Sequence, residues 1–62
     1  MDNMKYVGIA YNHREEIFYH FIENNFEIIK EKADMYFNEG CWVEIYRCNE
    51  ENRVCIYRKD KK

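Results

Sequence analysis

The stretch that decides the fold is Glu-Ile-Phe-Tyr-His-Phe-Ile, residues 16–22. Because side chains alternate across a β-strand, a strand here would carry apolar or aromatic groups on both of its faces. One face would hold Ile17, Tyr19 and Phe21, and the other Phe18, His20 and Ile22. A chain of 62 residues can supply one helix to cover one face of a sheet. We therefore expect the second face to meet a partner.

The same stretch has a rival interpretation as part of a long helix. Asn12 and Glu15 have the spacing of a capping box, from which a helix could begin. A helix over residues 13–39 would be about 40 Å long at about 1.5 Å per residue, too long for so small a domain. Consecutive β-branched and aromatic residues are also poor helix formers. We prefer a hairpin of two strands at about 5–11 and 16–22.

A helix is predicted at about 25–39. Asn24 can cap it, Glu27 follows at the capping-box spacing, and Gly40 comes after the last periodic residue. Apolar residues at helical spacing mark its buried stripe. They are Phe26, Ile29, Ala33, Tyr36 and Phe37.

Two further strands are predicted at about 42–48 and 53–58, with a turn over residues 49–52. That turn places Ile45 opposite Ile56, Arg47 opposite Val54 and Tyr46 opposite Cys55. The aliphatic face (Val43, Ile45, Val54, Ile56) would then pack on the helix. The other face would carry Trp42, Tyr46, Cys55 and Tyr57.

These elements predict an α+β fold in a single domain spanning residues 1–62. It is a two-layer β-β-α-β-β arrangement, with a four-stranded, mostly antiparallel sheet and one helix packed on one face. So small a core is marginally stable, which is a second reason to expect a partner or a dimer.

Composition narrows the class of protein. The net charge of −2 gives no basic excess for binding phosphates. No apolar run approaches the roughly 20 residues of a membrane span, and the first residues do not resemble a signal peptide. We expect a cytoplasmic protein with reduced cysteines and no membrane association. The abundance of Phe, Tyr, Ile, Asn and Lys suits AT-rich codons, as in a low-GC bacterium or its phages and plasmids.

Cysteines and histidines do not form a recognisable site. Cys41, Cys48 and Cys55 are spaced by seven residues, as are His13 and His20, whereas zinc ligands usually lie two to four residues apart. Cys48 lies near arginines that could activate a thiol, but no oxyanion site or pocket accompanies it. We therefore expect no metal, no cofactor, no small-molecule substrate and no enzymatic activity.

The aromatic sheet face is the predicted working surface. Interface hot spots are enriched in Trp, Tyr and Arg. We expect a small protein-binding module, an inhibitor or adaptor from a phage or other mobile element (an anti-defence, anti-CRISPR-like protein), that covers a larger host protein or forms a homodimer. The alternative is a module that binds single-stranded nucleic acid by stacking bases on the same aromatics. The candidate partner-binding residues are Trp42, Tyr46, Tyr57, Tyr19, Tyr6 and Arg47.

Overall fold

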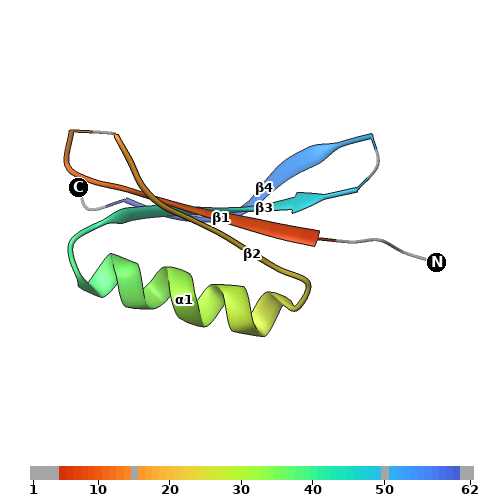
Figure 1. Ribbon diagram of the computed structural model, residues 1–62, viewed down its shortest axis with the longest axis horizontal. Coiled ribbons are helices and arrows are strands. Elements are labelled where there is room, and N and C mark those ends of the chain that lie inside the picture. Colours follow the sequence, from red (N-terminus) through yellow and green to blue (C-terminus); the bar gives the residue numbers. More distant parts are fainter. Residues whose placement is uncertain (1–4, 15, 50, 61–62) are drawn as a thin grey trace.

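The protein folds into two layers in the order β-β-α-β-β. The computed structural model describes residues 5–14, 16–49 and 51–60. Its elements are β1 (Lys5–Tyr11), β2 (Ile17–Glu23), α1 (Phe26–Asn38), β3 (Trp42–Cys48) and β4 (Arg53–Lys59). The strands form one sheet in the order β2-β1-β3-β4, and every neighbouring pair is antiparallel. Figure 1 shows α1 along one side of this sheet. The predicted α+β class is confirmed, and the rival long helix is wrong.

Two asparagines close the two hairpins. The Oδ1 atom of Asn12 accepts hydrogen bonds from the backbone N–H groups of Arg14 and Glu16, at 2.9 and 3.0 Å. In the second turn, Oδ1 of Asn49 accepts the backbone N–H of Asn52 at 2.8 Å. Asparagine favours turns because its short side chain can replace a backbone acceptor in this way. In both hairpins, an asparagine side chain therefore stabilises the turn that connects the two strands.

The helix begins one residue later than the predicted cap implies. Asn25, not Asn24, is the N-cap, and its Oδ1 accepts the backbone N–H of Ile28 at 3.2 Å. At the other end Gly40 has φ 108°, a left-handed conformation that glycine adopts without a Cβ clash. The predicted helix end at Gly40 is confirmed, and the reversal there returns the chain to the sheet.

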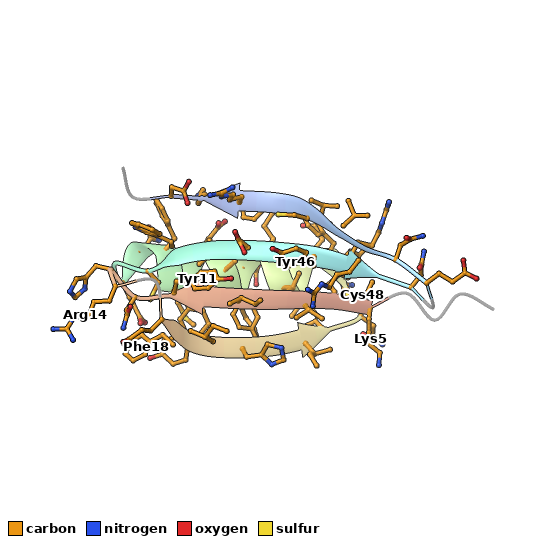
Figure 2. The ribbon with its side chains drawn as sticks, turned by 90° about the horizontal axis from the view of Figure 1, so that it is seen from above. Lys5, Tyr11, Arg14, Phe18, Tyr46 and Cys48 are labelled. Atoms are coloured by element: carbon orange, nitrogen blue, oxygen red, sulfur yellow. The ribbon has the colours of Figure 1, made fainter. Side chains whose placement is uncertain are left out.

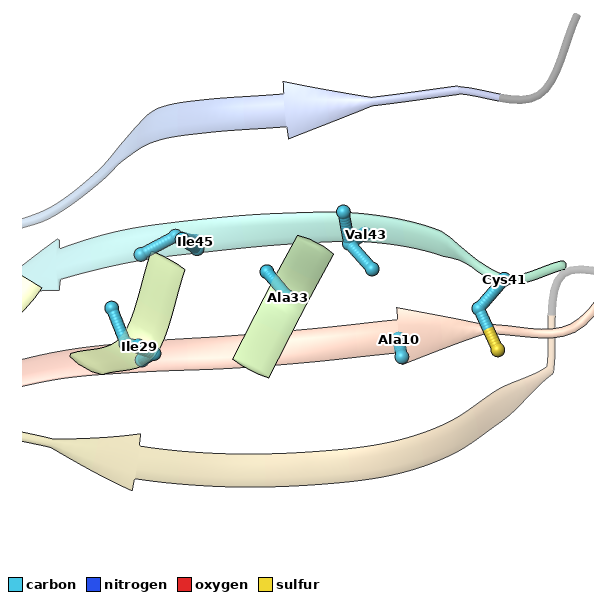
Figure 3. Close-up of a cluster of buried hydrophobic side chains, with 6 residues drawn as sticks. All are labelled: Ala10, Ile29, Ala33, Cys41, Val43 and Ile45. Carbon is cyan, nitrogen blue, oxygen red and sulfur yellow. The ribbon is translucent and has the colours of Figure 1, made fainter. Parts of the chain in front are cut away.

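The core lies between α1 and the two central strands, β1 and β3. Figure 3 shows its six buried side chains: Ala10, Ile29, Ala33, Cys41, Val43 and Ile45. Ile45, Val43 and Ile29 are the largest of them, and each is fully excluded from solvent. The predicted aliphatic contributions of Val54 and Ile56 are wrong, because their side chains remain 47% and 38% exposed on the edge strand β4.

A bulge in the second hairpin explains the correction for Ile56, whereas Val54 pairs with Arg47 as predicted and is exposed on the helix side of the edge strand. Tyr46 pairs with Cys55 as predicted, but Ile45 pairs with Tyr57 rather than with Ile56. The extra residue, Ile56, reverses the alternation of β4 for all residues that follow it. As a result Tyr57, and not Ile56, lies on the side of the sheet that faces the helix.

Tyr57 attaches the edge strand β4 to the helix. Its hydroxyl donates a 2.5 Å hydrogen bond to Oδ1 of Asp34 on α1. Lys30 and Lys59 also contact the Asp34 carboxylate, at 3.2 and 3.3 Å. The Tyr57 hydrogen bond is the main cause of a lowered Asp34 pKa, with the two lysines adding to it against the opposing effect of burial.

A second bulge shifts the first hairpin in the same way. Ala10 pairs with Tyr19, but Tyr11 pairs with Ile17, so that Phe18 is the extra residue. Ile17 therefore leaves the predicted face of Tyr19 and shares the face of Tyr11.

Candidate interaction surface

The side of the sheet opposite α1 is the candidate surface, and we call it the open face. Gly8 and Ala10 are buried beneath the helix, so their neighbours in β1 point the other way. Figure 2 looks onto this side, with Tyr11 and Tyr46 on the two central strands. The pairing registers then assign the remaining members. The open face comprises Lys5, Val7, Ile9 and Tyr11 of β1, Ile17, His20 and Ile22 of β2, Trp42, Glu44, Tyr46 and Cys48 of β3, and Arg53, Cys55 and Arg58 of β4.

A carboxylate lies at the centre of the open face. Oε1 of Glu44 accepts hydrogen bonds from the hydroxyls of Tyr11 and Tyr46, at 3.1 and 3.0 Å. Its Oε2 lies 3.7 Å from Nε of Arg58, and the Glu44 side chain is only 18% exposed. These contacts connect β1, β3 and β4 and hold the aromatic rings in fixed positions.

The two phenols respond to this carboxylate. The hydrogen bond to Glu44 is the main cause of a raised Tyr46 pKa. Burial is the larger cause of the raised Tyr11 pKa, followed by the hydrogen bond to Glu44. Both hydroxyls therefore stay protonated and act as hydrogen-bond donors.

A shallow hollow adjoins the carboxylate. It measures about 280 Å³ and is lined by Tyr11, Trp42, Glu44, Arg58 and Asp60. Its polar groups already contact one another through the Glu44 interactions and through the 3.5 Å ion pair of Arg58 with Asp60. The hollow therefore offers a recess beside Trp42 that a side chain of another molecule could enter.

The other half of the open face, over β1 and β2, is apolar. Val7 and Ile9 are partly buried, whereas Ile22 is 53% and Ile17 is 62% exposed. His20 is also exposed between them. The open face thus joins an apolar half to a polar, aromatic half, a composition typical of protein-interaction surfaces.

Two of the predicted site residues lie together on the open face. Trp42 and Tyr46 are both partly exposed there, and the guanidinium of Arg53 lies 5.2 Å from the centre of the Tyr46 ring. Arg47 is exposed, but it pairs with Tyr6 and so lies on the side that faces the helix. The structure therefore separates Arg47 from Trp42 and Tyr46.

The other three predicted tyrosines also lie on the helix side, and their placement on the aromatic open face is wrong. Each packs against α1 through a ring or a hydroxyl. Tyr6 has its ring centre 5.6 Å from that of Phe26, Tyr19 stacks on Tyr36 at 4.2 Å, and Tyr57 bonds Asp34. The bulge at Ile56 places Tyr57 on the helix side. Tyr6 alternates with Gly8 and Ala10 along β1, and Tyr19 pairs with Ala10, so both tyrosines lie on the helix side as well.

The sequence prediction missed Tyr11 and Glu44. A signal for Tyr11 was present, because the small residues Gly8 and Ala10 mark the side of β1 on which a helix can approach closely. That parity places Tyr11 on the opposite side. The role of Glu44 depends on hydroxyls from two strands and an arginine from a third, which no local pattern indicates.

Cys48 and Cys55 lie on the open face as free thiols. Cys41, Cys48 and Cys55 are free, and burial, followed by the charge of Glu39, raises the pKa of Cys41. Within residues 5–14, 16–49 and 51–60, no three His, Cys, Asp or Glu side chains gather as metal ligands would. The described helix is also not long and apolar enough to cross a membrane.

Comparison with known proteins adds no family. No protein-family model matches this chain, and neither does any curated protein or solved structure.

Proposed function

We propose that this protein is a non-enzymatic protein-binding module whose open face covers part of a larger protein. The observation that carries the proposal is the uncovered apolar and aromatic side of the sheet. Large exposed apolar areas on one face of a small domain are typical of interaction sites. Covering a partner in this way would make the protein an inhibitor or adaptor. Its abundance of Phe, Tyr, Ile, Asn and Lys, which AT-rich codons encode, suits a phage or other mobile element.

The two halves of the open face suit different parts of such a partner. Ile22 and its neighbours Val7 and Ile9 provide apolar area. Burying it against a partner would stabilise the complex by roughly 25 cal/mol per Å². Tyr11 and Trp42 line the hollow, where a partner side chain would meet their rings and the Glu44 carboxylate. Tyr46 donates a hydrogen bond to that same carboxylate. Because the carboxylate fixes the hydroxyl of Tyr46, little rotamer entropy is lost when a partner binds.

A nucleic-acid platform agrees less well with this geometry. Arg53 beside the Tyr46 ring could support base stacking and phosphate contact. Glu44 does not by itself repel phosphates, because Arg58 lies 3.7 Å from it and Lys5 is on the same face. The chain as a whole carries a net charge of −2, so there is no basic excess to attract a phosphate backbone.

The experiment compares the wild-type protein with two double variants as affinity baits in a lysate of host cells. Trp42→Ala with Tyr46→Ala truncates the open face. Ile28→Ala with Met35→Ala is the matched control, because these side chains are 45% and 48% exposed on the helix. Captured proteins are quantified by mass spectrometry, purified, and titrated against each bait by calorimetry.

We expect one captured protein that binds the wild type and the control equally and the Trp42/Tyr46 variant at least about tenfold more weakly. Equal binding by all three folded baits would show that the open face is not the binding surface. Fluorescent single-stranded RNA and DNA, tested at two salt concentrations, address the alternative. Binding that falls steeply with salt and is lost in the Trp42/Tyr46 variant would favour nucleic acid.

A further inference from the structure

The two edge strands of the sheet differ in how they meet solvent. An edge strand has backbone N–H and C=O groups that can pair with another chain, and natural proteins discourage such pairing with charges and bulges. β4 carries Arg53, Arg58 and Lys59 and a bulge at Ile56. It is therefore protected near both ends and interrupted in the middle.

β2 lacks the same protection. It contains no lysine or arginine, and its single charge, Glu23, lies at its end and is bound to Lys32 at 2.6 Å. Ile17, Phe18 and Ile22 are 62%, 59% and 53% exposed along it. Although a bulge lies at Phe18, the pairing with β1 is regular from Tyr19 to Glu23. A regular, apolar edge of this kind is a template for a further strand.

An aromatic cluster at the same edge is also incomplete. The Tyr19 ring stacks on that of Tyr36 at 4.2 Å and lies 4.9 Å from that of Phe18. Tyr19 is nevertheless 37% exposed, and Phe18 projects along the outer edge of the sheet (Figure 2). The cluster begins on α1 and ends in solvent beside β2. A second layer of aromatic side chains placed there would complete it.

We propose that the β2 edge pairs with β2 of a second copy of this chain. The two strands run antiparallel about a two-fold axis, so that two four-stranded sheets become one of eight strands with both helices on the same side. Directly opposed residues in an antiparallel pair share a face. In the register centred on His20, Tyr19 meets Phe21 of the second copy and Phe18 meets Ile22 of the second copy. The two His20 side chains then face each other at the centre, and Ile17 meets Glu23 of the second copy at each end.

Charge explains why this assembly closes at two copies. If both edge strands could pair, chains would add to each other without limit. Because only β2 is unprotected, its pairing with β2 of a second copy leaves no further edge available and the assembly stops at a dimer. The basic residues of β4 repel their own equivalents, so the outer edges of the dimer stay free. The dimer also enlarges the core of a domain that is small for independent stability. This pairing leaves the open face uncovered, although Ile22 lies both on that face and at the paired edge. Its test measures the oligomeric state and not the binding of a larger protein, so each proposal can fail without the other.

Sedimentation equilibrium of the full chain at tens of micromolar tests the proposal. Phe18→Lys with Ile22→Lys places charges on the β2 edge. Val54→Lys with Ile56→Lys is the matched control on β4, where the replaced side chains are also exposed. We expect the wild type and the control to be dimers and the β2 variant to dissociate at least about tenfold more readily, since each dimer loses apolar cross-strand pairs and gains nearby lysines.

A monomeric wild type would overturn the proposal, and so would equal weakening by the β4 control. Circular dichroism reports whether each variant is folded. If the lysine variant is unfolded, Phe18→Thr with Ile22→Thr keeps strand propensity and is expected to weaken the dimer in the same direction. In a mixed sample of isotopically labelled and unlabelled chains, nuclear Overhauser effects should connect Tyr19 with Phe21 of the other copy. Contacts through Trp42 and Tyr46 instead would place the second copy on the open face and refute β2 pairing.

Discussion

Gly8 is the position at which the smallest change should have a clear effect. It lies in β1 opposite Phe21 of β2, and the Phe21 ring covers it on the side that faces the helix. A Cβ built on Gly8 would lie 2.5 and 2.6 Å from Cζ and Cδ2 of that ring, and closer still to Cε2. Gly8→Ala therefore requires the Phe21 ring to move. Tyr36 hinders that movement, because its ring centre lies 5.2 Å from that of Phe21.

The magnitude is a difference between two effects. Overpacking a filled site costs about 1–3 kcal/mol. Replacing glycine by alanine restricts the unfolded chain, which stabilises the fold by about 0.4–1 kcal/mol where the conformation allows a side chain. The expected net change is a loss of about 1–2 kcal/mol in the free energy of unfolding. That loss is a large fraction of the roughly 3–5 kcal/mol expected for so small a core.

Urea unfolding followed by circular dichroism measures this loss, and a second background tests its cause. In Phe21→Ala the ring is absent, so that Gly8→Ala should become neutral or stabilising by about 0.4–1 kcal/mol. Sodium sulfate can be added to every sample to keep the weakest variant folded. An equal loss in both backgrounds would refute the claim that contact between Gly8 and Phe21 limits this site.

Three further predictions concern the core, the attachment of β4 and the open face. Ile45→Ala should lower the free energy of unfolding by about 2–5 kcal/mol, because it removes a fully buried side chain; a loss below 1 kcal/mol in urea unfolding would contradict this core. Tyr57→Phe should cost about 1–2 kcal/mol by removing the hydrogen bond to Asp34. That hydrogen bond lowers the Asp34 pKa in the folded state. Its contribution to stability is therefore complete above the ordinary aspartate pKa and is lost as the pH falls through the lower pKa of the folded state. The melting temperature of Tyr57→Phe should accordingly depend less on pH in that acidic range than the melting temperature of the wild type. Glu44→Gln should lower the Tyr46 pKa, seen as phenolate absorbance appearing at lower pH, and an unchanged titration would argue against the Glu44 contact.

Much of the fold could be predicted from local patterns. The apolar run from residue 16 predicted a strand with two apolar faces, and helical spacing predicted the buried Ile29 and Ala33 of α1. Asn12 and Gly40 marked chain reversals through their own conformational preferences. Such features depend on neighbouring residues, which a single sequence contains.

The candidate surface was predicted only in part. Trp42 and Tyr46 lie on the open face as expected, but Tyr57 was placed on the wrong side. A strict alternation of side chains cannot anticipate a bulge, because one inserted residue reverses the face of everything after it. The network around Glu44 was also missed, since it forms only when β1, β3 and β4 lie side by side.

The sequence by itself determined which segments are strands, which is the helix, and that the sheet carries more apolar area than one helix can cover. Periodicity and turn chemistry act within a few residues, so they do not depend on the rest of the chain. The tertiary structure alone decided which face of each strand meets α1, and which edge remains unprotected. Those features depend on strand order, bulges and the close approach of Phe21 to Gly8, which arise only when distant segments pack against one another.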